Sequence, residues 1–193
     1  MPKVEVFNKD YVLEQASNVF HLKGYNATSM QDLVDATGLN RSSIYNSFGN
    51  KLSLFLECLK NYQNKYSKIT ASTLIKSENS LEAIESIFNL YLSEILSDKD
   101  RKGCLITNCK SEMANQDLLI NNFLNNNQEQ TLQLFESLIS QGQNEGLINK
   151  NQTAKNYSLF LFSSIQGFRM TGILINDKKQ LQGIIKMTLQ ILN

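Results

Sequence analysis

The stretch from Thr28 to Lys51 constrains this chain most, because its residues predict two short helices joined by a tight turn. Thr28 is a suitable N-cap for the first helix, and Gln31 three residues later completes the spacing of a capping box. Gly38 can end that helix in the left-handed region. Asn40 can cap the second helix. The pattern therefore predicts a helix, a glycine turn and a second helix in close succession.

The second of these helices has an apolar side and a polar side. Ile44 and Phe48 recur at helical spacing and are expected in the core. The side chains left to face outward are Arg41, Ser42, Ser43, Tyr45, Asn46 and Ser47. This arrangement predicts a helix-turn-helix whose second helix enters the major groove of DNA. Arginine and asparagine can bind base edges there, and hydroxyls can bind phosphates. An ordinary helical hairpin with a solvated face fits the same pattern.

From Phe20 to Leu56 the sequence resembles the TetR family of bacterial transcription regulators. The residues that carry the resemblance are Phe20, Gly24, Tyr25, Thr28, Ser29, Met30, Asp32, Leu33, Ala36, Gly38, Leu39, Ser43, Ile44, Tyr45, Phe48, Lys51 and Phe55. The resemblance implies an N-terminal three-helix DNA-binding domain followed by a helical effector-binding and dimerisation domain. At Asn46-Ser47 and at Gly49-Asn50 the chain has residues other than those most common in the family. These differences affect which bases would be bound rather than the fold.

The resemblance also implies a function and a set of DNA contacts. The expected protein is a homodimeric repressor that binds a palindromic operator in double-stranded DNA and is released by a small-molecule effector. Thr28 and Lys51 would bind phosphates at the starts of the second and fourth helices. The recognition helix would contribute the side chains of Arg41, Ser42, Ser43, Tyr45 and Asn46.

The rest of the chain favours an all-α fold with about nine helices, because apolar residues recur at helical spacing and no strand pattern or repeat is present. The single proline, Pro2, leaves the body free to be helical. After a lead-in of residues 1–7, Asn8 can cap a first helix that Gly24 ends. Further helices are expected over residues 51–73, from a cap at Ser80, over 104–113 and 118–143, from a cap at Thr153, and over 178–192.

These elements suggest two domains, a DNA-binding domain over residues 1–50 and an effector-binding and dimerisation domain over residues 51–193. The helix after Thr153 is apolar on nearly every side, so we expect it to be buried on more than one face. Dimerisation is therefore expected through this helix and the last one. Gly167 and Gly172 lack side chains and would let another helix approach closely.

Composition narrows the class of protein. The formal net charge of +1 is a weak electrostatic signal for a DNA-binding protein, so charge counting does not support that function. Three cysteines, an odd number, argue against a disulfide framework and fit a reducing cytoplasm. No apolar run approaches the length of a membrane span, and no signal peptide opens the chain. We expect a cytoplasmic protein that does not enter a membrane.

An enzyme is not expected. His21 is the only histidine, and the sequence has no Ser/His/Asp set, no metal-ligand spacing and no glycine loop of the phosphate-binding kind. The sequence therefore predicts no catalytic residues, no metal site and no cofactor. Two alternatives remain open at this stage. One is an all-helical enzyme or carrier that uses the helix-turn-helix only structurally, since paired carboxylates are compatible with the sequence. The other is a DNA-binding protein that needs no ligand.

An effector pocket is expected in the body, between the far end of the 51–73 helix and the later helices. Its candidate aromatic and sulfur side chains, each of which could instead belong to the core, are Tyr62, Tyr66, Phe88, Tyr91, Met113, Phe135, Phe162 and Met170. Gln166 and Arg169 are polar residues in an apolar helix, so they are candidates to orient a ligand. The sequence names neither the effector nor the operator or the regulated genes, and it does not separate repression from activation.

Cys104 is a candidate redox sensor. It follows Arg101-Lys102-Gly103 and is expected at the start of a helix. A helix N-terminus and nearby cations both stabilise a thiolate. The Gly-Cys-Leu order also resembles that of TetR-type regulators that sense electrophiles or oxidants. The alternative is a small apolar residue of the core.

Overall fold

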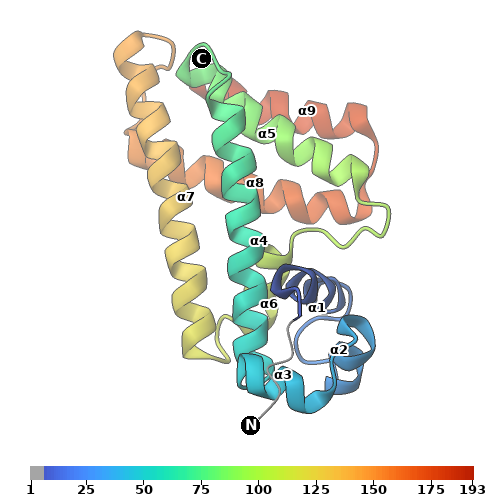
Figure 1. The fold of residues 1–193 in the computed structure, drawn as a ribbon. Helices are drawn as coiled ribbons and strands as arrows, with labels where there is room; N and C mark the ends of the chain where they lie inside the picture. The colour runs from blue at the N-terminus through green and yellow to red at the C-terminus, as the bar shows by residue number, and fades with distance from the viewer. Residues whose placement is uncertain (1–6) are drawn as a thin grey trace.

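Helices account for all regular structure in residues 7–193, the part of the chain that the computed structural model describes (Figure 1). They are α1 (Lys9–Lys23), α2 (Met30–Thr37), α3 (Arg41–Phe48), α4 (Lys51–Leu74), α5 (Ser80–Ser97), α6 (Leu105–Met113), α7 (Leu118–Glu145), α8 (Ala154–Leu174) and α9 (Lys178–Leu189), followed by a 3-10 turn (Gln190–Leu192). The expected all-α fold class is confirmed. The lead-in expected over residues 1–7 lies outside the described residues apart from Phe7.

Helices α1, α2 and α3 gather at one end of the molecule and form a head, from which the long α4 runs into the body (Figure 1). Two short helices cannot bury a core alone, so α1 and α4 cover them. The rings of Phe20 in α1 and Phe55 in α4 lie 4.8 Å apart between centroids. Leu33 of α2 and Ile44 of α3 are completely buried against them.

The predicted cap of α2 is wrong by one residue. Ser29, not Thr28, is the N-cap, and its side chain accepts from the backbone N–H of Asp32. The Asp32 carboxylate in turn accepts from the backbone N–H of Ser29, at 2.8 Å. Thr28 is only 1% exposed and its hydroxyl donates to the carbonyl of Gly24. Because that bond closes the turn after α1, Ser29 is the first side chain free to cap.

Most other helix ends follow the sequence. Asn8, Asn40 and Thr153 are N-caps, as predicted. Gly38 ends α2 in the left-handed region, with φ 71°. Ser80 is an exception, because it is the first residue of α5 and the side chain of the residue before it caps the helix.

The body has a second core in which α5 packs against α7, α8 and α9. Phe88, Phe135 and Phe168 are among its largest buried side chains. Gly172 of α8 serves this packing, since a Cβ there would lie 2.5 Å from the side chain of Ile95 in α5. The close helix approach expected at Gly172 therefore occurs within the chain.

The first core crosses the expected domain boundary. It continues from the head through α4 to Cys104, Cys109 and Met113 near and in α6, and on to Ile120 and Leu124 in α7. Head and body thus share one continuous apolar cluster. The division at residue 50 remains a proposal about function, because the packing does not separate the two parts there.

The capping box of α2 predicts a pH dependence. Hydrogen bonding to the Lys23 ammonium, 2.6 Å away, and to Ser29 holds the pKa of the Asp32 carboxyl at about 2, below its usual 3.8. Because the folded-state pKa is the lower one, this stabilisation is complete above about pH 4 and is lost as the pH falls towards 2. Asp32→Asn should therefore lower the free energy of unfolding at neutral pH, and its difference from wild type should shrink from pH 4 to 2.

Urea unfolding followed by circular dichroism measures this difference. Asp35→Asn is the matched control, since Asp35 lies exposed on the same helix and, within residues 7–193, accepts only from Gln31. A difference between Asp32→Asn and wild type that stayed constant across this pH range would contradict the assignment.

Candidate DNA interface and effector cavities

Helix α3 presents a polar face at the tip of the head. Asn40 accepts from the backbone N–H of Ser43 at 2.8 Å and so fixes the start of the helix. Ile44 and Phe48 anchor its inner side in the core. The exposed residues of the helix are Arg41, Ser42, Tyr45, Asn46 and Ser47, whereas Ser43 is half-buried. Four of the five recognition-helix residues predicted from the resemblance therefore reach solvent.

The two residues predicted to bind phosphate, Thr28 and Lys51, lie beside the turn between α1 and α2. The Lys51 ammonium donates to the carbonyls of Tyr25 and Thr28, at 2.9 and 2.8 Å, and lies 4.3 Å from the centre of the Tyr25 ring. Two of its three N–H groups are thus used inside the chain. The phosphate contact predicted for Thr28 stays a prediction, and in this structure its hydroxyl is buried and donates to the carbonyl of Gly24. Both residues instead hold residues 24–28, the head turn, which joins α1 to α2.

A carboxylate from the body is hydrogen-bonded to the same turn. Glu112 of α6 accepts from the backbone N–H groups of Tyr25 and Asn26, at 2.9 and 2.7 Å. At Gly24, with φ 80°, an added Cβ would lie 2.9 Å from that carboxylate. A larger residue there would be strained at this positive φ and would push the Glu112 carboxylate aside. This contact could not be predicted from the sequence, because the partners are 86 and 87 residues apart and no local pattern links them.

An inner cavity of about 280 Å³ lies among α4, α5, α6, α7 and α8. The predicted effector residues that line it are Tyr62, Tyr66, Tyr91, Phe135, Phe162, Gln166 and Arg169. The prediction missed further polar lining residues, among them Thr107 and Lys110 of α6. Lys110 belongs to a short helix whose orientation the sequence did not fix.

Three predicted pocket residues lie away from the inner cavity. Phe88 is 1% exposed and packs against Phe168, with 6.4 Å between ring centroids. Met113 is buried in the first core, beside the head. Met170 is 46% exposed on the outer side of α8. The reason for this last error is that α8 is apolar on nearly all sides, so its sequence does not show which side faces the cavity.

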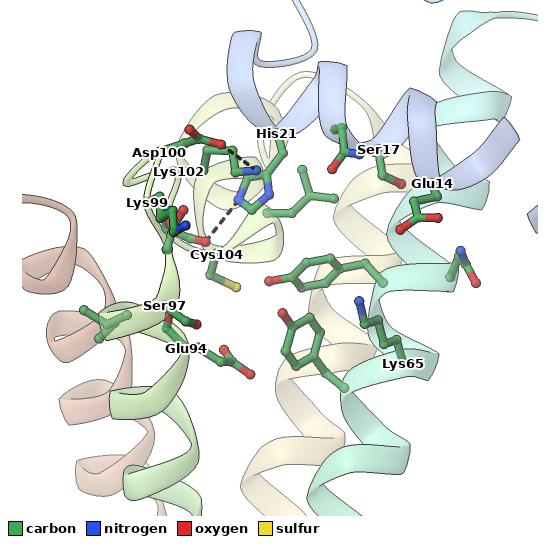
Figure 2. A pocket seen from close by; sticks show the side chains of 18 of the residues that line it. Glu14, Ser17, His21, Lys65, Glu94, Ser97, Lys99, Asp100, Lys102 and Cys104 are labelled. Carbon is green, nitrogen blue, oxygen red and sulfur yellow. Dashed lines mark hydrogen bonds and ion pairs between the residues drawn. The ribbon is translucent and has the colours of Figure 1, made fainter. Parts of the chain in front are cut away.

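A larger junction cavity, of about 860 Å³, lies between the head and the body. It is lined by α1, α4 and the segment from the end of α5 to the start of α6, and Figure 2 shows Cys104 and Glu94 directed into it. His21 Nε2 lies 3.0 Å from the carbonyl of Gly103 across this junction. Residues that line both cavities form a partition between them: Tyr62, Tyr66, Cys104 and Arg169.

Arg169 of the partition forms a partly buried ion pair with Glu94. Arg169 Nη2 lies 2.9 Å from Glu94 Oε2, and its guanidinium lies 4.2 Å from the centre of the Tyr91 ring. Burial raises the pKa of the Glu94 carboxyl, and Arg169 opposes that shift. Within residues 7–193, Glu94 Oε1 is buried without a hydrogen-bond partner. The charge of Arg169 at the cavity wall is therefore neutralised by Glu94.

The three cysteines are free and buried. Cys104 is 3% exposed and occupies the N-cap position of α6, where its side chain makes no capping bond. Burial raises the pKa of both the Cys58 and the Cys109 thiol to about 12. All three cysteines belong to the first core, but of the three only Cys104 also borders the two cavities.

A head that exposes a polar recognition helix, joined to a helical body with internal cavities, defines a DNA-binding transcriptional regulator. The chain belongs to the TetR family. Residues 12–58 match the family model described as bacterial regulatory proteins, tetR family. The HTH-type transcriptional repressor ComR of Escherichia coli is 30% identical over 171 residues, which cover 86% of this chain and 80% of ComR.

Further similar proteins support this family assignment. The HTH-type transcriptional regulator YezE of Bacillus subtilis is 25% identical over 194 residues and matches over the full length of both chains. A cysteine mutant of the TetR-family regulator CifR, solved in complex with a 26-bp double-strand operator DNA, has the same fold, with a TM-score of 0.88. It is 19% identical, and the match covers 99% of this chain and 100% of that one. Over residues 7–193, no helix is long and apolar enough to cross a membrane.

The Glu112 contact yields a second prediction. Replacing the carboxylate by an amide removes one of its two acceptor oxygens and its charge. Hydrogen bonds to charged groups contribute about 1.5–3 kcal/mol each. In Glu112→Gln we therefore expect the amide protons of Tyr25 and Asn26 to exchange with solvent about ten-fold faster or more, as measured by NMR.

Glu129→Gln is the control for this experiment. Glu129 lies exposed on α7 and, in the part of the chain that the structure describes, accepts only from Gln133. Unchanged exchange at Tyr25 and Asn26 in Glu112→Gln would show that Glu112 does not hold the head turn.

Proposed function

We propose that this regulator is a homodimeric repressor that binds a palindromic operator and is released by a small-molecule effector. The observation that carries this proposal is the contact between Glu112 and the head turn, because it connects a helix that lines the inner cavity to the DNA-binding head. The similarity to the repressor ComR supports repression rather than activation. As a member of this family, the protein acts on DNA in the cytoplasm and catalyses no reaction.

The exposed face of α3 offers side chains for two kinds of DNA contact, to base edges and to phosphates. Arg41 and Asn46 read base edges, since their side chains can make paired hydrogen bonds to guanine and adenine. Ser42 and Tyr45 bind phosphates and fix the register. Ser29, the exposed N-cap of α2, takes the phosphate role first assigned to Thr28. Lys51 contributes to DNA binding indirectly, because its hydrogen bonds position the head turn from which α2 begins.

An apolar stripe on the outside of α8 supports the dimer. Its members are Leu159, Phe160, Gly167, Met170 and Leu174, all exposed. At 100° per residue they fall within an arc of about 100°. Among the described residues, nothing lies within 4 Å of a Cβ added at Gly167 or at Gly183 of α9. For a second copy packed on this stripe to read a palindrome, the two recognition helices must lie about 34–36 Å apart.

Selection from a random DNA library tests this function. We expect an inverted repeat whose half-sites lie about one helical turn apart, bound by two chains per site. Sedimentation should show a dimer at micromolar concentration without DNA. A monomer both with and without the selected DNA, or a library with no enriched sequence, would contradict the proposal.

Substitutions in α3 refine the same experiment. Arg41→Ala and Asn46→Ala should each relax the preference at particular bases, at a cost of about 1–3 kcal/mol. Lys150→Ala, an exposed substitution in the turn after α7, should leave affinity and preference unchanged. Equal binding by wild type and both α3 variants would show that another surface reads the DNA.

Cys104 remains a candidate sensor, since it is the cysteine that borders both cavities. Adding an electrophile or an oxygen to its sulfur would place new bulk in the partition next to Tyr62. We expect hydrogen peroxide or N-ethylmaleimide to release wild type from its operator but not Cys104→Ser. Cys109→Ser, changed at a packing cysteine of the same helix, should respond as wild type does. Equal responses from wild type and Cys104→Ser, or none from either, would make Cys104 a structural residue.

A further inference from the structure

The inner cavity has a one-sided charge. Of the described residues that line it, the charged ones are Lys110 and Arg169, and none is an aspartate or a glutamate. Arg169 is paired with Glu94, which lines the junction cavity but not the inner one. Lys110 is therefore the charge of the inner cavity that is left without a counterion.

Lys110 is held in an unusual position for a lysine. It is half-buried, and its ammonium lies 4.6 Å from the centre of the Phe162 ring. Among residues 7–193, no carboxylate lies within salt-bridge distance of it. Lysines taken out of water are usually paired with an anion. Burial lowers the pKa of this ammonium, and an anion brought next to it would reverse that effect.

Other polar groups of the cavity are also hydrogen-bond donors. Gln166 accepts from the Thr107 hydroxyl through Oε1, and its amide nitrogen has no protein partner within the described part of the chain. Burial raises the pKa of the Tyr62 phenol, which keeps its proton available as a donor. A cavity that offers donors and a cation but no acidic group is suited to an acceptor that carries negative charge.

The remaining walls are apolar. They include Ile87, Leu134, Phe135, Phe162 and Ile165. A volume of about 280 Å³ is near the lower end of the range for ligand sites in proteins. The ligand that fits these walls is therefore compact, with one apolar body and one charged end.

We propose that the inner cavity binds a small organic carboxylate, whose charged end meets Lys110 and Gln166 and whose apolar body lies against Phe135 and Ile165. The proposal rests on the proposed function in so far as this ligand is the effector. The position of Lys110 on α6 places the anion on the helix that also carries Glu112.

Matched probes test the charge of the ligand. Benzoate and hexanoate are each compared with the corresponding amide and amine by isothermal titration calorimetry on the full-length protein. We expect both carboxylates to bind wild type at a single site, about ten-fold or more tightly than the neutral and cationic analogues. Lys110→Met, which keeps the apolar stem, should reduce the affinity for the carboxylates to that for the amides, whereas Lys110→Arg should retain most of it.

Lys65→Met is the control, since Lys65 lines the junction cavity only and its loss should not change carboxylate binding. The inference is overturned if wild type binds neither carboxylate at millimolar concentration, if an amide or amine binds as tightly, or if Lys110→Met binds as wild type does. Adding the operator separates the two proposals. Carboxylate binding that depends on Lys110 but leaves the protein on DNA would support this inference and refute effector release.

Discussion

The hold of Glu112 on the head turn is the interaction on which the rest of the structure depends. Its carboxylate accepts from two consecutive backbone N–H groups, while Lys51 donates to two carbonyls of the same turn. The turn is thus fixed from the body through its donors and from α4 through its acceptors. Since α2 begins directly after the turn, the orientation of the helix-turn-helix is tied to the position of α6. The continuous first core reinforces this link.

Local features of the fold could be predicted from the sequence, and long-range ones could not. Gly38 and Asn40 were correctly placed because a left-handed glycine and an asparagine cap act within four residues. Thr28 and Ser29 are both good caps, and the choice between them depends on a hydrogen bond from Thr28 to Gly24 that no spacing rule shows. The recognition helix could be predicted because its apolar residues are few and regular.

The candidate site was less predictable for a physical reason. Seven of the ten expected pocket residues line the inner cavity, but an all-round apolar helix such as α8 does not show which face is inward, so Met170 was misplaced. Among the described residues, the unpaired state of Lys110 depends on which acids are absent around it, a property of five helices at once. The contact of Glu112 with Tyr25 joins residues 87 positions apart.

The geometry of α6 suggests why a charge in the cavity can act on the head. Lys110 and Glu112 are two residues apart, so their side chains leave the helix about 200° apart. Lys110 faces the inner cavity and Glu112 faces the head turn, on opposite sides of a helix of nine residues. In the proposed mechanism this helix shifts as one unit against the first core, in which its residues Leu105, Cys109 and Met113 are buried. An anion that draws Lys110 further into the cavity would therefore pull Glu112 away from the backbone N–H groups of the turn. That motion would release α2 and α3 from the position in which they are held.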